Sequence, residues 1–515
     1  MPKDYVIGVS SGIWGVIKKE EVLGINKKLQ WIATSGTNHV QVDLETINEF
    51  KEPDLKEKIE RSKKSLNINF GIHGEARPIV GMDTLPLDSA LMADYIRAHD
   101  RLMIHVKECS KLGAEYCTIH SSESKPFIVL WHELQSTNLC DFWGRPLREF
   151  LEENKRIAEW LLSIKDKPQL GDILRHIPSA DYILREYLIP HYKSEHEGKM
   201  PDEKELKKLK EEAHGEAVKR LINFVNSGES HYGGERIAYL AVAKWMQSER
   251  DYLWDKIVGR ILDDKTMLTK TEKWVPAVAA KYIWGHFCPR KGGYPDPKPI
   301  LKDKRMYFCF EAPMAERGYE GYMRLVTLTD IYYMCEAIGS PWVGMTMDME
   351  HMMSCNIDPK KDIENLPPKG GQRLKVVHVT VPTPMNPSHL PVPLGSEAQL
   401  YIYERLYDLR KKGFKTGWWI FERGGEEGLI KDTVTVMRMI KKYLEKGVDP
   451  KKLPPEFFGM DMEAADWKTQ VLKVKDHAFD PLKGLLVTPE EQMGVFGEAA
   501  KEKGKIAEWL KEKYR

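Results

Sequence analysis

Histidines and carboxylates recur along this chain at the ends of short apolar stretches. One stretch, within residues 341–351 (PWVGMTMDMEH), stops at Asp348 and is followed three residues later by His351. Five other apolar stretches also end in a His or a Glu, which gives the set His73, His120, Glu311, Asp348, His378 and Glu422. Neutral imidazoles combined with carboxylates are ligands of zinc, manganese and iron. The pattern therefore predicts a divalent-metal site, to which loops add His351 and His389.

Each of these residues also has an ordinary structural interpretation. A histidine at the end of a strand is commonly a hydrogen-bonded structural group, and Glu311 fits a capping residue. Asp348 fits a helix N-cap with His351 as its neighbour. Six consecutive strands that end this way are harder to explain without a cation, because crowded, unpaired carboxylates and imidazoles are costly to bury. The recurrence therefore favours metal binding.

Eight short apolar segments must position these residues, and we expect them to be strands. They are residues 5–9, 39–43, 68–73, 116–120, 305–311, 342–348, 375–379 and 417–422. Helical periodicity is predicted between them, over 54–66, 89–112, 325–338, 396–412 and 430–445. The alternation favours an α/β fold of the (β/α)8 TIM barrel type over an open doubly wound sheet, since no G-x-G-x-x-G turn follows an early strand. In such a barrel the carboxyl ends of the strands meet at one mouth, where active sites lie.

A long segment interrupts the alternation between the fourth and fifth strands. We expect a mostly helical insertion over residues 125–304, with helices at 147–164, 172–189, 203–224 and 235–255 and a return linker at 288–300. The barrel is then predicted over 1–124 and 305–447, and a C-terminal extension, with a helix at 489–514, over 448–515. Two segments, 132–133 and 231–235, are candidates for a lid over the mouth, although their interpretation as ordinary helix and loop residues is favoured.

The composition limits the classes of function. The 515-residue chain has 78 Lys and Arg against 77 Asp and Glu, and a net charge of +1 gives no global field that favours DNA. The seven cysteines form no CxxC pair, which is typical of reduced thiols in a cytoplasmic protein. We expect neither a signal peptide nor a membrane association, because no apolar run approaches the roughly 18 residues of a span.

In order and strand placement, these motifs resemble the xylose isomerase-like barrel superfamily, and most closely its endonuclease IV (AP endonuclease family 2) branch. The resemblance implies that His73, His120 and Glu311 bind one ion, and that Glu311 bridges to a second ion. Asp348, His378 and Glu422 would hold that second ion, and His351 with His389 would remain for a third. Pro387 stands where the family has an aspartate, and GEARPIVG (74–81) replaces the family's loop after His73. The implied cofactors are zinc or manganese ions, two in number, with the third position incomplete.

Three functions fit this set of residues. The first is a metal-dependent hydrolase acting on a small-molecule or nucleic-acid phosphoester, with Glu311 and Glu422 as catalytic carboxylates and Arg423 pairing with the anionic substrate. Two ions about 3.5–4 Å apart would clamp such an ester. The second is a sugar isomerase or epimerase with one ion on Glu311, Asp348, His378 and Glu422, whose glutamates move protons. The third is a degenerate barrel used as a binding scaffold. A homo-oligomer is compatible with all three.

Overall fold

The computed structural model describes residues 2–12, 24–74, 85–122, 138–167, 174, 177–225, 234–315, 324–382, 389–422 and 430–460. The chain divides into two compact units, Met1–Pro391 with Asp408–Val434 and Val392–Tyr407 with Thr435–Arg515. All eight strands belong to the first unit. This division does not test the expected boundaries of barrel, insertion and extension, which stay predictions.

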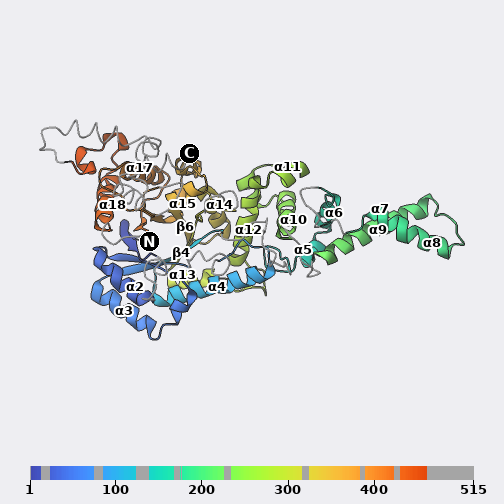
Figure 1. Cartoon of the computed structure of the whole chain (residues 1–515), viewed down its shortest axis with the longest axis horizontal. Coiled ribbons are helices and arrows are strands. Elements are labelled where there is room, and N and C mark those ends of the chain that lie inside the picture. The colour runs from blue at the N-terminus through green and yellow to red at the C-terminus, as the bar shows by residue number, and fades with distance from the viewer. Residues whose placement is uncertain are drawn as a thin grey trace, which may run out of the picture. The chain divides into compact units, whose positions relative to one another are not determined.

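The eight strands form a closed barrel in which every strand is parallel to its neighbours and the order around the barrel is the order in the chain. The strands are β1 (Tyr5–Ser10), β2 (His39–Asp43), β3 (Asn69–His73), β4 (Tyr116–His120), β5 (Tyr307–Glu311), β6 (Val343–Asp348), β7 (Leu374–His378) and β8 (Gly417–Phe421). Two of these strands, β4 and β6, are labelled in Figure 1. The barrel closes where β1 pairs with β8. The predicted (β/α)8 fold is therefore confirmed.

The strand boundaries agree with the predicted ones to within two residues. One difference concerns the site: β8 ends at Phe421, so Glu422 lies one residue beyond its strand instead of closing it. The β1–β8 register pairs Val9 with Phe421, and Glu422 follows directly at the same edge of the barrel. The shift therefore does not remove Glu422 from the mouth.

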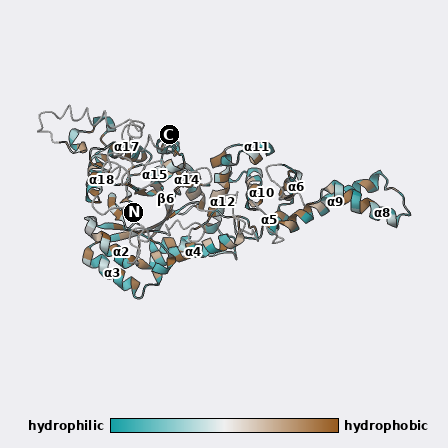
Figure 2. Ribbon diagram, in the orientation of Figure 1, coloured by the Kyte–Doolittle hydropathy of each residue, from teal (hydrophilic) through white to brown (hydrophobic). Residues whose placement is uncertain are grey.

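Helices separate the strands, and those predicted at 54–66, 89–112, 325–338, 396–412 and 430–445 are present, whereas the short helices at 25–32 and 359–365 were not predicted. The helices include α2 (Ile25–Ile32), α3 (Leu55–Leu66), α4 (Met92–Leu112), α14 (Leu328–Ile338), α16 (Pro359–Asn365), α17 (Glu397–Lys411) and α18 (Ile430–Glu445). Gly113 and Gly339 end α4 and α14 in the left-handed conformation, at φ 73° and 72°, where glycine avoids a side-chain clash. Figure 2 shows hydrophilic and hydrophobic residues alternating along α4, as expected for a helix with one buried side. No helix in the described part of the chain is long and apolar enough to cross a bilayer.

The described residues between β4 and β5 are mainly helical, as expected. The helices are α5 (Leu147–Glu153), α6 (Lys155–Ser163), α7 (Ala180–Ile183), α8 (Ile189–Glu195), α9 (Glu203–Phe224), α10 (Gly234–Ser248), α11 (Asp264–Thr269), α12 (Val275–Phe287) and α13 (Lys298–Lys304). The helix predicted at 203–224 is confirmed. The one predicted at 147–164 is wrong as a single helix, because Asn154 leaves the helical conformation between α5 and α6. The helix predicted at 235–255 stops at Ser248, and the expected linker at 288–300 already contains the start of α13.

Helix α12 was not predicted, and its burial explains why. Eleven of its thirteen residues are buried, so it has no polar side to produce a helical period. It packs against α10 and against α14, which lies between β5 and β6. Even Lys281 is buried in α12, with its ammonium 2.6 Å from Asp251 and 3.9 Å from the centre of the Trp284 ring.

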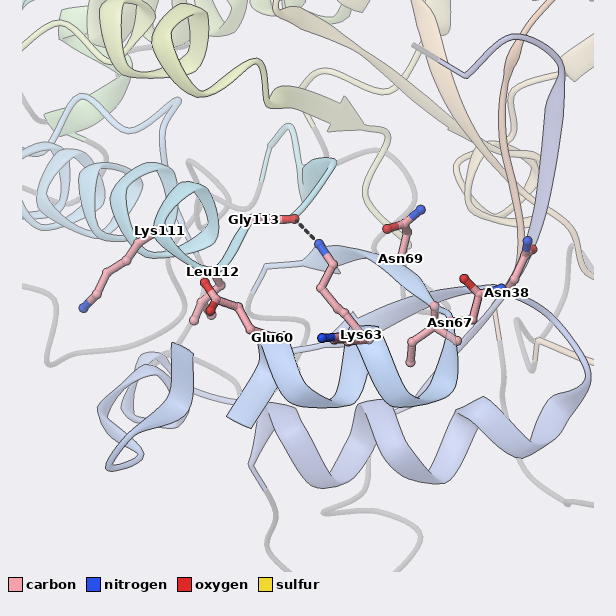
Figure 3. A pocket seen from close by; sticks show the side chains of 10 residues that line it. Asn38, Glu60, Lys63, Asn67, Asn69, Lys111, Leu112 and Gly113 are labelled. Carbon is pink, nitrogen blue, oxygen red and sulfur yellow. Dashed lines mark hydrogen bonds between the residues drawn. The ribbon is translucent and has the colours of Figure 1, made fainter. Parts of the chain in front are cut away.

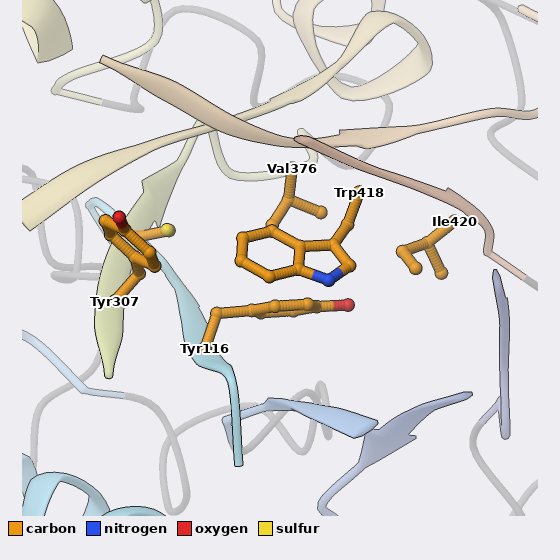
Figure 4. Packing of buried hydrophobic residues seen from close by; sticks show 6 residues of the cluster. Tyr116, Tyr307, Val376, Trp418 and Ile420 are labelled. Atoms are coloured by element: carbon orange, nitrogen blue, oxygen red, sulfur yellow. The ribbon is translucent and has the colours of Figure 1, made fainter. Parts of the chain in front are cut away.

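Alternate residues of the strands fill the barrel in layers, because side chains of a strand point to opposite faces in turn. The layer farthest from the mouth is aromatic: the Tyr116 and Trp418 rings lie 5.0 Å apart, and Tyr307 lies 5.9 Å from Trp418. These rings pack with Cys309, Val376 and Ile420 (Figure 4). Two residues further along each strand, the next layer includes Gln41, Thr118 and Thr346, and beyond it lie the residues of the mouth.

Gly71 on β3 makes room for this packing, since a Cβ atom there would overlap the Tyr116 ring. We expect Gly71→Ala to lower the free energy of unfolding by about 1–3 kcal/mol, the usual cost of overpacking a core. Gly215→Ala is the matched control, because Gly215 lies within α9 with open space around its Cβ position. There the same change should stabilise the chain by about 0.5–1 kcal/mol. Equilibrium denaturation of both variants measures the signs, and equal signs would contradict this account of the core.

Candidate metal centre

The ends of six strands and two following segments bring the predicted ligands together at the barrel mouth. Their donor atoms form three groups, and within each group all donor atoms lie within 4.8 Å of one another. The groups are His73, His120 and Glu311; Glu311, Asp348, His378 and Glu422; and Asp348, His351, His389 and Glu422. Three carboxylates are thus each shared by two groups, which is the arrangement needed for ions that lie side by side.

Glu311 joins the first group to the second. Its side chain is fully buried, and its two oxygens face different imidazoles. Oε2 lies 3.3 Å from His73 Nε2, while Oε1 lies 2.8 Å from His378 Nδ1 and 3.4 Å from His351 Nδ1. His120 completes the first group, with its ring centre 5.2 Å from that of His73. A carboxylate held in this way can offer one oxygen to each of two cations.

The second group surrounds His378, the last residue of β7. Its Nδ1 lies 2.8 Å from Glu422 Oε2 and 3.7 Å from Asp348 Oδ2, in addition to Glu311. One imidazole nitrogen cannot donate a hydrogen to three carboxylates. A cation among these oxygens, with His378 Nδ1 as its fourth ligand, would satisfy all of them.

Asp348 combines both interpretations that its sequence context allows. It is the N-cap of the short helix α15 (Met349–Ser354), because its Oδ1 accepts a 2.9 Å hydrogen bond from the His351 backbone N–H. This cap turns the chain so that His351 faces the mouth. Its Oδ2 is buried and has no hydrogen-bond partner among the described residues. One oxygen is therefore structural, and the other remains for a ligand.

Neighbouring groups fix the orientation of each imidazole, as outer partners commonly do at metal sites. His73 Nδ1 lies 2.7 Å from the Gly74 carbonyl, and His351 Nδ1 lies 3.2 Å from the Ala312 carbonyl. A proton on Nδ1 of either ring would bond that carbonyl and leave Nε2 as the donor atom to a metal. The Glu350 carboxylate lies 3.1 Å from both the backbone N and the Nδ1 of His389.

His378 has the opposite orientation, because its Nε2, and not its Nδ1, faces a hydrogen-bond acceptor outside the group of predicted ligands. Its Nε2 lies 3.2 Å from Gln41 Oε1, which also accepts a hydrogen bond of 3.1 Å from the Tyr116 hydroxyl. Since an amide oxygen only accepts, Nε2 carries the proton and Nδ1 faces the carboxylates. Gln41 in turn donates to Asp43 Oδ1 at 3.1 Å.

Sequence reasoning missed Gln41, Asp43 and Glu350. All three are buried, and Asp43 ends β2 at the mouth. A signal for Asp43 was present, because HVQVD is one more apolar strand that stops at an acid. Gln41 lies on the same inward-facing side two residues earlier. Nothing local marks Glu350, whose contacts with Thr380 and His389 come from distant parts of the chain.

Buried polar atoms without partners test whether the site fits a cation. His73 Nε2, Glu311 Oε2 and Asp348 Oδ2 are buried and make no hydrogen bond to any described residue, although the first two atoms form an ion pair at 3.3 Å. Leaving such atoms unsatisfied is expensive in a protein interior. Because they converge with donors of the types that zinc and manganese bind, the residues present fit divalent ions.

Burial and mutual attraction shift the pKa values of these groups strongly. Burial opposes a charged imidazole, yet the Glu311 carboxylate outweighs it and raises the pKa of His73 to about 9. Against the same effect of burial, Asp348 and Glu311 raise the pKa of His351 to about 10. Burial favours a neutral carboxyl at Glu311, but His378 and the other imidazoles hold its pKa well below the usual range. Burial raises the pKa of Asp348 to about 6. Without metal, protons therefore supply the positive charge.

Several predicted positions lie outside the described residues. These are Arg423, the proposed substrate-binding residue, Pro387, and the possible lid segments 132–133 and 231–233. All eight predicted ligands are among the described residues and lie at one mouth of the barrel. Their role as metal ligands stays a prediction. A surface pocket of about 450 Å³ lies away from the mouth, beside Asn38 and Asn69 at the starts of β2 and β3 (Figure 3). That is the opposite end of the barrel.

Comparisons with known proteins return barrels of similar fold. No protein-family model and no curated protein sequence matches the chain. A D-tagatose 3-epimerase-like protein matches 86% of this chain and 98% of its own, with 12% identity and a TM-score of 0.40. A fusion of a xylose isomerase-like TIM barrel with a 4-hydroxyphenylpyruvate dioxygenase matches 93% of this chain and 45% of its own, with 9% identity and a TM-score of 0.38.

An E. coli 3-keto-D-glucoside 4-epimerase matches 85% of this chain and 99% of its own, with 8% identity and a TM-score of 0.35. One of these three structures is named as a xylose isomerase-like TIM barrel and two carry epimerase names, while the endonuclease IV branch is not shown. At these identities and scores the similarity concerns the fold. The function is argued below from the site.

The raised pKa values predict that metal binding releases protons. Below about pH 9, His73 and His351 carry protons that a bound cation must displace, so affinity should rise by about tenfold per pH unit for each proton displaced. Titration of the chelator-treated chain with Mn²⁺ between pH 6 and 8, in buffers of different protonation enthalpy, measures both affinity and proton release. An affinity independent of pH over this range would contradict the assignment of these imidazoles as ligands.

Because Gln41 contacts His378, we predict that Gln41 influences metal affinity although it is not itself a predicted ligand. Gln41→Leu keeps the approximate size but removes the acceptor for His378 Nε2, so we expect about 10–100-fold weaker metal binding. Thr346→Val is the control, because it removes a buried hydroxyl bonded to Thr118 in the same layer of the barrel. It should reduce stability and leave the affinity unchanged. Equal affinities for wild type and Gln41→Leu would show that Gln41 does not orient His378.

Proposed function

We propose that this chain is a divalent-metal-dependent hydrolase that binds at least two ions at the barrel mouth and acts on a phosphoester. The observation that carries the proposal is the position of Glu311, whose Oε2 faces His73 and whose Oε1 faces His378. A bridging carboxylate needs two separate sets of partners, and this one has them. A site for a single ion would give His73 and His120 no metal role.

Bound divalent ions would supply Lewis acidity toward an ester oxygen and would lower the pKa of water to near neutrality. The chain's own residues hold and orient the donors for this chemistry. Glu311, Asp348 and Glu422 spread negative charge along the row of donor groups, so that cations can lie close together. Paired divalent ions of this kind serve phosphatases and nucleases. The ester class follows the resemblance to endonuclease IV. Arg423, which follows Glu422 in the chain, would contact the anionic substrate.

A second candidate function is a sugar isomerase or epimerase with one ion. The observation in its favour is that Glu311, Asp348, His378 and Glu422 form a complete four-ligand group without His73 or His120. Glu311 and Glu422 would then also move a proton at a carbon next to a carbonyl. Epimerases are also among the barrels of similar fold, but that similarity does not weigh between the two activities.

Counting ions and changing His73 separates the two functions. We expect two or more Zn²⁺ or Mn²⁺ ions per wild-type chain by elemental analysis. His73→Ala should lose one ion, and hydrolysis of bis(p-nitrophenyl) phosphate or abasic-site DNA should fall by about 100-fold or more, since even outer partners of a metal contribute about 10–100-fold. His39→Ala is the matched control, because His39 is equally buried inside the barrel but at its far end beside Glu115. It should keep its ions.

The outcomes exclude each other. One ion in the wild type, together with turnover of ketoses that survives in His73→Ala, would reject the hydrolase and support the isomerase. No bound metal and no turnover of esters or ketoses would reject both, in favour of a scaffold.

A further inference from the structure

A buried ion pair links α10, in the helical segment between β4 and β5, to the rim of the barrel. Glu235 at the start of α10 accepts two hydrogen bonds from the Arg324 guanidinium, 3.0 Å from Nη1 to Oε1 and 2.8 Å from Nη2 to Oε2. The Arg324 side chain is only 2% exposed. Its Nη1 also bonds the Tyr239 hydroxyl at 3.0 Å, one turn further along α10. Paired contacts of this kind fix both position and orientation.

Arg324 continues this linkage to the chain that carries His120. Its backbone N–H donates to Ser122 Oγ at 3.1 Å, and Ser122 Oγ donates to Asp88 Oδ2 at 2.7 Å. Ser122 lies two residues after His120, the last residue of β4. The Arg324 Nη1 also donates to the Asp88 carbonyl at 3.2 Å.

The intervening residue Ser121 ties the same chain to β5. Its backbone N–H donates to the Glu311 carbonyl at 2.7 Å, and its hydroxyl donates to the Leu325 carbonyl at 2.8 Å. The two residues that follow His120 are therefore held by the Glu311 carbonyl of β5 and by the backbone of Arg324 and Leu325, whose position Glu235 fixes through the Arg324 guanidinium.

Loss of the Glu235 charge has a definite structural consequence. The Arg324 Nε lies 3.8 Å from Asp88 Oδ2, the oxygen that Ser122 now bonds. A buried guanidinium without Glu235 would move toward that carboxylate and compete with Ser122 for it. Ser122, and with it His120, would then lose a fixed position relative to His73 and Glu311.

We propose that Glu235 is a positioning residue for the metal group formed by His73, His120 and Glu311. The segment between β4 and β5 is thereby a working part of the site, and its α10 contributes a carboxylate that acts through Arg324 and Ser122. This inference rests on the proposed function only in requiring that the group binds a divalent ion. In the single-ion isomerase, His73 and His120 have no metal role, and Glu235 would then position no metal ligand.

The test compares two variants that each break a buried ion pair in the same segment. Glu235→Gln removes the charge facing Arg324. Asp251→Asn removes the charge facing Lys281, and this ion pair is buried to a similar extent. Asp251 contacts Lys281 and the backbone N–H of Leu253, and both residues lie within the helical segment itself. Chelator-treated full-length chains are titrated with Co²⁺ and Mn²⁺, and bound ions are counted after dialysis. Thermal unfolding is recorded on the metal-free chains.

We expect both variants to unfold at lower temperature than the wild type. Only Glu235→Gln should lower the binding affinity for one class of ions, by about tenfold or more, while the remaining ions bind with unchanged affinity. Ser122→Ala, which cuts the link while keeping the Glu235–Arg324 pair, should weaken the same ions and serves if Glu235→Gln does not fold. Equal ion number and affinity in a folded Glu235→Gln, or in Ser122→Ala, would overturn the proposal. A wild type that binds no ion would instead reject the proposed function.

Discussion

The buried carboxylate of Glu311 sets the conditions for the rest of the mouth. A fully buried anion is unfavourable unless cations or strong hydrogen-bond donors surround it. Glu311 receives imidazoles from β3, β7 and α15, so three distant parts of the chain must converge before its burial is tolerable. In the absence of metal, the raised pKa values of His73 and His351 show how the site balances this charge with protons. Divalent ions would replace these protons as the source of positive charge.

The closed barrel makes this convergence possible because its strands are short and end at the same height. The register pairs His120 with Glu311 and Asp348 with His378 across neighbouring strands, so each of these predicted ligands lies beside another. The same two-residue period places Gln41 below His378 and the Tyr116 and Trp418 rings below that. A single alternation thus gives the barrel an apolar end for stability and a polar end for chemistry. Gln41 contacts both ends, because it forms hydrogen bonds with His378 on the polar side and Tyr116 on the apolar side.

The sequence alone was enough to predict the strands and eight of the residues at the mouth, although not Asp43, for one physical reason. Buried parallel strands appear as short apolar runs, and the first polar residue at each end stands out against them. The same local signal cannot reveal partners that come from far away. Glu350 is an unremarkable glutamate in a helix until the fold brings it to His389, and α12 has no helical period because it is buried on nearly all sides.

Local signals also could not decide between structural and chemical roles, and Asp348 shows why. Capping and ligation need the same residue type at the same place, the first residue after a strand and before a helix. The two roles are compatible because a carboxylate has two oxygens: Oδ1 accepts the His351 N–H, and Oδ2 faces the other donors. A cap that shares a residue with the site also fixes the position of His351. For Asp348 the structural role and the chemical role therefore do not exclude each other.

Part of the segment between β4 and β5 packs against the helices of the barrel and so belongs to its outer layer. A (β/α)8 barrel needs a helix between these strands to cover its outer surface. Helix α12 meets that need, since it packs against α14, the helix between β5 and β6, and α13 packs against α4. The additional helices therefore precede α12 in the chain and leave the barrel at the end of β4, beside His120. An addition at the bottom of the barrel could affect only stability, whereas an addition at this position has direct access to the residues that hold the ligands.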